Sequence, residues 1–293
     1  MIVIAAPAKI NLYLHIVGKC DDGFHCLESL VAFVKVCDFV SVQNSSRLVL
    51  KNIGPFGDSV WVSNNLVMRA ARYFQKISDI NLGAEIILTK NLPISSGVGG
   101  GSSDATATIK ALSRLWNIRL EDCDFSELVT YLGADAPICL LGRTAFVSGV
   151  GEKLNPINIS PIVPIVLINP MVGLSTPTVF KSHKKPFTNK MIMVPPPYDF
   201  EPLIRFLSKN CKNDLTDSAI SLVPEILTVL DILKKNSGCM LARMSGSGAT
   251  CFGVFETILA ANSAASKIQK NNPRWWVKST ELIGRTHLSS SYS

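Results

Sequence analysis

Pro93-Ile94-Ser95-Ser96-Gly97-Val98-Gly99-Gly100-Gly101-Ser102-Ser103-Asp104 is the stretch from which the fold is best deduced. Consecutive glycines have no Cβ atoms, so their backbone N–H groups can curl into a concave nest for an anion. A helix that starts directly after them adds unpaired N–H donors and its positive dipole end. Ser102 and Ser103 add hydroxyl groups. We therefore predict a phosphate-binding loop followed by a helix.

This loop differs from two better-known phosphate motifs. A Walker A loop would carry a lysine after its last glycine, where this chain has Ser102. The dinucleotide-binding pattern would carry Gly or Ala at the same position. The structural alternative is a flexible glycine loop with a serine cap on the next helix.

Working outward, strand and helix patterns alternate in the first half of the chain. Ala105, Ile109, Leu112 and Trp116 recur at helical spacing, which predicts a helix over 102–116 with Asp104 in its first turn. Strands are predicted over 2–17, 30–42, 47–51 and 84–89, and helices over 65–76 and just after Asp135.

The second half of the chain begins near three prolines within 155–164. Strands are predicted over 162–168, 242–244 and 251–255, helices over 200–208, 224–235 and 258–270, and an exposed loop over 182–197. This mixture favours an α+β fold of two layered domains, 1–158 and 159–293.

Composition limits the classes of protein. The chain is 47% hydrophobic and 17% charged, which excludes disorder over most of its length. No secretory signal and no apolar run of membrane-spanning length is visible, so we expect a cytoplasmic protein. Its eight cysteines form no C-x-x-C pair and are expected to be reduced. The net charge of +7 favours an anionic partner: a nucleotide, a phosphorylated metabolite or nucleic acid.

Four motifs together resemble the GHMP kinases, in the family's order and over nearly the whole chain. They are Pro7-Ala8-Lys9-Ile10-Asn11-Leu12, residues 93–104, Gly133-Ala134-Asp135-Ala136-Pro137 and Met244-Ser245-Gly246-Ser247-Gly248-Ala249. Three more look like the branch that acts on 4-diphosphocytidyl-2-C-methyl-D-erythritol. These are Asp22-Gly23-Phe24-His25, Asn64-Asn65-Leu66-Val67 and Ser175-Thr176-Pro177.

The resemblance implies a fold and an activity. The N-terminal half would be like ribosomal protein S5 domain 2 and the C-terminal half ferredoxin-like, with the active site between them. The enzyme would use ATP and Mg²⁺ to phosphorylate a hydroxyl of 4-diphosphocytidyl-2-C-methyl-D-erythritol, giving the 2-phosphate in the non-mevalonate isoprenoid pathway. It would be a bacterial cytoplasmic monomer or weak homodimer, without a nucleic-acid or membrane partner and without an assigned metal ligand.

The resemblance also assigns the reacting groups. Asp135 would be the catalytic base and Lys9 its partner at the acceptor hydroxyl. A positioned carboxylate can take the hydroxyl proton, while an ammonium stabilises the charges that develop. The structural alternatives are a helix N-cap for Asp135 and a solvated strand face for Lys9.

Binding residues follow in the same way. For ATP they are Asn64, Asn65, Leu66, Pro93, Gly97, Gly99, Gly100, Gly101, Ser102 and Ser103; for the cytidyl substrate they are Asn11, Phe24, His25, Thr176, Phe180, Gly246 and Ser247. Rings such as Phe24 suit a flat base, although many family members have Tyr at that position. The alternatives are core packing for Phe24 and Phe180, and an ordinary turn at 244–249.

Three rival functions stay open at this point. Another GHMP kinase would act on homoserine or mevalonate, which carry no nucleobase. A nucleic-acid-binding protein would gather its basic residues in one patch, and here they are scattered apart from 181–190. A homologue that binds its ligand without catalysing a reaction would not need both Lys9 and Asp135.

Overall fold

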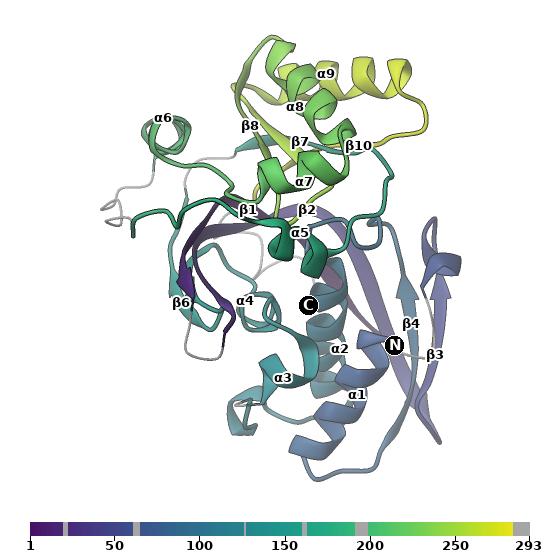
Figure 1. Cartoon of the computed structure of the whole chain (residues 1–293). Helices are drawn as coiled ribbons and strands as arrows, with labels where there is room; N and C mark the ends of the chain where they lie inside the picture. Colours follow the sequence, from purple (N-terminus) through teal and green to yellow (C-terminus); the bar gives the residue numbers. More distant parts are fainter. Residues whose placement is uncertain (20–22, 61–64, 126, 160–162, 191–198, 284–293) are drawn as a thin grey trace.

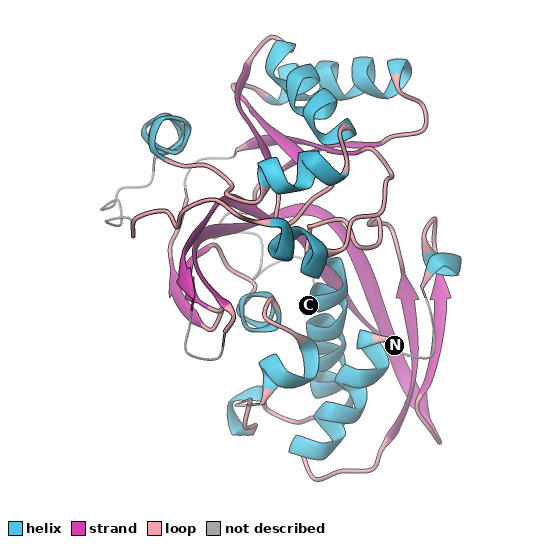
Figure 2. Ribbon diagram, in the orientation of Figure 1, coloured by secondary structure: helices cyan, strands magenta, loops and turns pink. Residues whose placement is uncertain are grey.

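Two sheets divide the chain between them in this computed structural model (Figure 1). The structure describes all residues except 20–22, 61–64, 126, 160–162, 191–198 and 284–293. One sheet is built from strands before residue 157 and the other from strands after residue 163. Helices lie against both sheets (Figure 2). The predicted two-domain α+β fold is confirmed, whereas its exact boundary at 158/159 stays a prediction.

The first sheet is organised around two long, antiparallel strands. Its members are β1 (Ile2–Lys19), β2 (His25–Ser45), β3 (Val49–Ile53), β4 (Gly83–Thr89), β5 (Ala145–Gly149) and β6 (Lys153–Pro156). The order is β3-β4-β2-β5-β6, with β1 paired to β2 from Ile2 opposite Val42 to Lys19 opposite His25. The predicted strands are all present. β5 and β6 were not predicted from the sequence.

Helices α1 (Leu66–Ile77) and α2 (Gly100–Trp116) pack together against this sheet, where Phe74 and Trp116 stack with ring centroids 5.9 Å apart. Two short helices follow, α3 (Leu128–Leu132) and α4 (Ala136–Leu141). The predicted start of α2 was two residues late. Gly99 precedes the helix with a φ of 63°, which allows Gly100 to begin it. Asp104 is consequently outside the first turn.

The second sheet has the order β10-β7-β9-β8, and all its pairs are antiparallel. Its strands are β7 (Pro164–Asn169), β8 (Cys239–Met244), β9 (Cys251–Phe255) and β10 (Trp276–Glu281). Helices α8 (Glu225–Lys235) and α9 (Ile258–Asn271) connect the strands in a β-α-β-β-α-β succession. This is the ferredoxin-like topology that was expected. β10 was not predicted from the sequence.

Among the described residues between β7 and α8 there are three helices: α5 (Thr176–Ser182), α6 (Phe200–Asn210) and α7 (Thr216–Leu222). The segment after α6 returns to the first sheet. Leu14 donates its N–H to the carbonyl of Lys212 at 3.0 Å and accepts from the N–H of Asp214 at 2.9 Å. One hydrophobic cluster also draws residues from both sheets, among them Ile10 and Phe252. The two halves therefore share a core.

Two further expectations can be compared with the fold. Cys26 is disulfide-bonded, which corrects the expectation that all the cysteines are reduced. Within the described ranges, every helix is too short or too polar to cross a membrane.

Candidate active site

A cavity of about 570 Å³ opens between the two halves, a size typical of small-molecule sites. It brings together most of the residues that the sequence singled out. Those lining it are Lys9, Asn11, Asn65, Leu66, Pro93, Gly97, Gly99, Gly100, Gly101, Ser102, Asp135, Thr176, Phe180, Gly246 and Ser247. Asn64 lies outside the described residues.

Side chains at two of the loop glycines would collide with neighbouring groups. A Cβ atom on Gly97 would lie 2.5 Å from the Ser245 carbonyl oxygen, and one on Gly99 would lie 3.0 Å from Cε of Lys9. Both glycines also have positive φ angles, 77° and 63°. The N–H groups in the first turn of α2 have no intrahelical acceptors. The loop is thus close-packed, and flexibility alone does not account for its glycines.

The turn at 244–249 fixes the glycine loop from the other half of the molecule. The Ser245 hydroxyl donates to the Gly97 carbonyl at 2.9 Å and accepts from the N–H of Asn11 at 3.3 Å. Asn213 supports the turn by donating to the carbonyls of Met244 and Gly246, both at 2.8 Å. This turn therefore has a specific structural role in the site.

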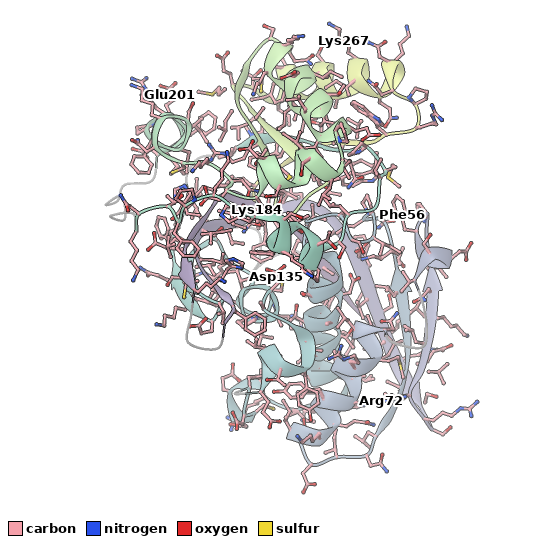
Figure 3. All side chains as sticks on the ribbon, in the orientation of Figure 1. Phe56, Arg72, Asp135, Lys184, Glu201 and Lys267 are labelled. Carbon is pink, nitrogen blue, oxygen red and sulfur yellow. The ribbon has the colours of Figure 1, made fainter. Side chains whose placement is uncertain are left out.

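Lys9 and Asp135 form an ion pair beside the loop, with Nζ and Oδ2 3.1 Å apart. Lys9 is only 4% exposed, which rules out a solvated strand face. The Asp135 side chain is 45% exposed, lies between the two halves (Figure 3), and makes no capping hydrogen bond to α4. Its carboxylate is therefore available to the cavity.

The Lys9 ammonium is held in place by a second partner. Nζ donates to Oδ1 of Asn11 at 3.1 Å, and Nδ2 of Asn11 donates to Oγ of Ser29 at 2.9 Å. Ser29 in turn donates to the carbonyl of Tyr13. Ser29 lines the cavity and was not found from the sequence.

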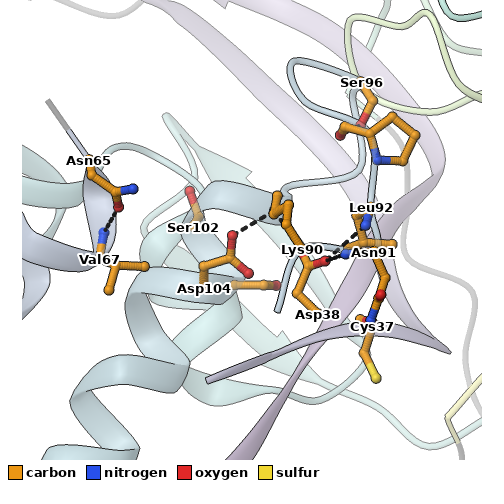
Figure 4. A network of polar contacts seen from close by, with 12 residues as sticks. Cys37, Asp38, Asn65, Val67, Lys90, Asn91, Leu92, Ser96, Ser102 and Asp104 are labelled. Carbon is orange, nitrogen blue, oxygen red and sulfur yellow. Dashed lines mark hydrogen bonds and ion pairs between the residues drawn. The ribbon is translucent and has the colours of Figure 1, made fainter. Parts of the chain in front are cut away.

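A buried charge cluster below the loop was also missed (Figure 4). Nζ of Lys90 lies 2.5 Å from Oδ2 of Asp38 and 2.6 Å from Oδ2 of Asp104. Burial raises the pKa of Asp104 to about 8; Lys90 opposes this shift and Asp38 adds to it. Burial alone would lower the pKa of Lys90, but the two carboxylates outweigh it and raise that pKa. Asp104, expected to interact with the helix dipole, is instead part of this cluster.

Asn65 and Ser103 were both expected to bind ATP, but only Asn65 lines the cavity. Oδ1 of Asn65 caps α1 by accepting from the N–H of Val67 at 2.8 Å, which leaves its Nδ2 for the cavity. The Ser103 hydroxyl donates to the Pro7 carbonyl at 2.7 Å, and its N–H donates to the Gly99 carbonyl. Ser103 is not among the residues that line the cavity, contrary to its expected phosphate contact.

Three aromatic residues gather at α5, which carries Phe180. His25 packs on Phe180 with centroids 5.5 Å apart, and His183, missed from the sequence, packs edge-on to His25 at 6.3 Å. Burial lowers the pKa of His25, and His183 and Lys19 add to this effect. Phe24 is 68% exposed, so it is not a core residue, and it does not line the cavity. Oγ1 of Thr176 lies 2.7 Å from Oγ of Ser247.

Both halves of the chain match one family of enzymes. The GHMP kinases N terminal domain matches residues 65–143, and the GHMP kinases C terminal domain matches residues 198–274. A 4-diphosphocytidyl-2-C-methyl-D-erythritol kinase of Paramagnetospirillum magneticum is 40% identical over 280 residues, covering 96% of this chain and 98% of that protein. The chain belongs to the GHMP kinase family.

Other GHMP kinases agree with this assignment. A protein of Cereibacter sphaeroides with the same description is 44% identical, covering 95% of this chain and 98% of its own length. A crystal structure of 4-(cytidine 5'-diphospho)-2C-methyl-D-erythritol kinase superposes with a TM-score of 0.78 at 32% identity, covering 97% of this chain and all of the other. Homoserine kinase from Cytophaga hutchinsonii, at 15% identity and a TM-score of 0.65, shares the fold. As a GHMP kinase, this chain is an ATP-dependent phosphotransferase.

Proposed function

We propose that this GHMP kinase transfers the terminal phosphoryl group of ATP to a hydroxyl of 4-diphosphocytidyl-2-C-methyl-D-erythritol. The product would be the 2-phosphate, an intermediate of the non-mevalonate isoprenoid pathway. Relatives of that description cover nearly the whole chain. The observation that carries the mechanism is the Lys9–Asp135 ion pair directly beside Gly99.

Asp135 acts as the base in this proposal. Its carboxylate takes the proton of the acceptor hydroxyl while the hydroxyl oxygen bonds to the terminal phosphorus, and the bond from that phosphorus to the bridging oxygen breaks to release ADP. Lys9 keeps its charge throughout, because its ammonium stabilises the carboxylate, the attacking oxygen and the phosphoryl oxygens. Asn11 holds the ammonium in position.

The residues present fit ATP. The backbone around Gly97 and Gly99 leaves a cradle that a Cβ atom would fill, and the first turn of α2 supplies N–H donors. We assign this loop to the phosphates and Asn65 and Leu66 to the adenine side. Asn64 keeps its proposed adenine role from the sequence alone.

Mg²⁺ is proposed to enter with the nucleotide phosphates. No group of three or more His, Cys, Asp or Glu side chains in the described part of the chain could hold a metal ion. Bound to the phosphates, Mg²⁺ would neutralise part of their negative charge during transfer. Positioning of the reacting atoms then depends on the glycine loop, Lys9 and Asp135.

The cytidyl group is assigned to the side of the cavity that carries Phe180 and Thr176. The ring of Phe180 is backed by His25 and offers a face for a flat base. Thr176, Ser247 and Gly246 offer polar contacts, and Phe24 is proposed as an outer ring because it is exposed at the surface. We also propose a bacterial cytoplasmic location and a monomer or weak homodimer.

The function can be tested by following ADP release from MgATP with a panel of acceptors. The panel contains 4-diphosphocytidyl-2-C-methyl-D-erythritol, homoserine and mevalonate. ADP should form with the first acceptor only, and Asp135→Asn should abolish it. Release with homoserine or mevalonate instead would reassign the substrate, and release with none would overturn the proposed reaction.

A further inference from the structure

Ser103 is buried, and both of its hydrogen-bond donors are already used. The residue is 2% exposed. Its N–H donates to the Gly99 carbonyl at 2.9 Å, and its hydroxyl donates to the Pro7 carbonyl at 2.7 Å. The neighbouring Ser102 lines the cavity, whereas Ser103 does not. The second serine of the motif therefore acts on the protein around it and has no donor left for a phosphate.

The Pro7 carbonyl lies where β1 departs from regular pairing with β2. The register of the two strands shifts between Pro7 and Lys9. At this shift two backbone groups of β1 bond outside the sheet. One is the Pro7 carbonyl, which accepts from Ser103, and the other is the Lys9 N–H, which donates to the Val98 carbonyl at 2.8 Å. Irregularities of this kind re-aim side chains next to active sites. The position of Lys9 thus depends on α2 and the glycine loop.

The same hydroxyl also contacts the helix that follows Asp135. Oγ of Ser103 lies 3.5 Å from Sγ of Cys139, which is buried on α4. The Cys139 N–H donates to the Asp135 carbonyl at 3.1 Å, so this contact lies one helical turn after the proposed base. Nζ of Lys110, also on α2, donates to the Cys139 carbonyl at 3.3 Å. Two side chains of α2 therefore hold α4 at Cys139.

We propose that Ser103 is a positioning residue, whose hydroxyl holds the strand that carries Lys9 and the helix that follows Asp135 at the separation that their ion pair requires. Nζ of Lys9 and Oδ2 of Asp135 are 3.1 Å apart. A misplacement of about 1 Å in a reacting group can cost about 10²-fold in rate. The hydroxyl thus acts on turnover through its two neighbours and leaves nucleotide affinity unchanged. This inference rests on the proposed function, in which Asp135 is the base.

The test compares the two adjacent serines by steady-state kinetics and by calorimetry with ADP. Ser103→Ala should lower kcat with the cytidyl acceptor by about 10- to 100-fold, because the Pro7 carbonyl loses its donor and the ion pair shifts. The Kd of this variant for ADP should stay that of the wild type. Ser102→Ala should show the opposite split, with weaker ADP binding and a smaller change in kcat, since Ser102 lines the cavity.

Two further variants separate positioning from a general loss of stability. Ser103→Thr keeps the hydroxyl and should retain more of the wild-type kcat than Ser103→Ala does. Ser113→Ala is the matched control on the same helix. It removes the hydrogen bond from the Ser113 hydroxyl to the Ile118 carbonyl, 2.9 Å long, and should keep the wild-type kcat because neither residue lines the cavity.

Three results would overturn the proposal. An unchanged kcat in Ser103→Ala would show that the hydroxyl does not position the pair. A raised Kd for ADP in that variant would return the hydroxyl to the nucleotide phosphates. A kcat in Ser103→Thr no higher than in Ser103→Ala, or an equal loss in Ser113→Ala, would assign the effect to packing. Absence of turnover in the wild type would instead overturn the proposed function, which no comparison among the variants can do.

Discussion

At the scale of single residues, the Lys9–Asp135 pair is the feature from which chemistry follows most directly. We predict that Asp135→Asn lowers kcat by about 10²–10⁴-fold, because the amide cannot accept the hydroxyl proton. The KM for ATP should change little. Steady-state kinetics with the cytidyl acceptor will measure both, and a kcat within a factor of two of wild type would exclude Asp135 as the base.

Phe180 allows a prediction about substrate choice. Removing its ring in Phe180→Ala should raise the KM for the cytidyl acceptor about 10- to 100-fold, which corresponds to the loss of one base-stacking contact. The KM for ATP should stay constant. The matched control is Phe187→Ala, since Phe187 is also partly exposed but lies outside the cavity. A similar rise in both variants would contradict the assignment.

Residues that belong to one short motif could be placed at the cavity from the sequence. Contacts between residues far apart in the sequence could not be predicted. The glycines at 97–101 lie close together in the sequence, so their common place in one loop at the cavity could be predicted. Lys90 and Asp38 are 52 positions apart in the sequence, and the residues next to them do not indicate that they form an ion pair. Ser103 was assigned by its place in the motif, but its hydroxyl faces Pro7 because helical geometry turns it away from the cavity.

At the scale of elements, the glycine loop and the turn at 244–249 are in close backbone contact. A methyl group at Gly97 would lie 2.5 Å from the Ser245 carbonyl oxygen and 2.7 Å from that of Gly248. We predict that Gly97→Ala displaces the loop and lowers both Tm and nucleotide affinity. Gly173→Ala is the control, since its Cβ would meet nothing within 4 Å. Unchanged ADP affinity in Gly97→Ala would show that the turns can separate without consequence for binding.

Elements with a strong pattern were predicted well, whereas several short ones were missed, although the five-residue β9 was predicted over its exact range. The helix α9 and the long strand β1 show clear periodicity over many residues, and their predicted ranges are confirmed to within two residues at the end. β5, with five residues, and β10, with six, gain their stability from neighbouring strands. The stability of these strands comes from pairing with strands that are distant in the sequence, so the residues of the strand itself do not reveal it.

At the scale of the whole molecule, Arg243 connects the two halves. Its buried guanidinium on β8 donates to the carbonyl of Leu12 on β1 and to the carbonyls of Leu207 and Cys211, the latter two near the end of α6. Burial lowers the pKa of Arg243 to about 10. We predict that Arg243→Met lowers the free energy of unfolding by roughly 3 kcal/mol, because three buried carbonyls lose their donor. Urea unfolding will measure this.

Arg205→Met is the control for that measurement, since Arg205 lies exposed on α6 and its loss should cost little. If both variants unfold at the same urea concentration, Arg243 does not stabilise the junction. The side chains that join the halves could not be predicted from the sequence, because Arg243 and Leu12 are 231 positions apart.

The Ser245 hydroxyl has a consequence for how substrates reach the cleft. Its hydrogen bonds to Asn11 and Gly97 connect β1, the glycine loop and the turn at 244–249. A movement of the two halves away from each other would break these two hydrogen bonds and expose the buried Ser245 to water. We therefore expect the catalytic cycle to proceed without hinge opening, with entry and exit governed by side chains at the rim.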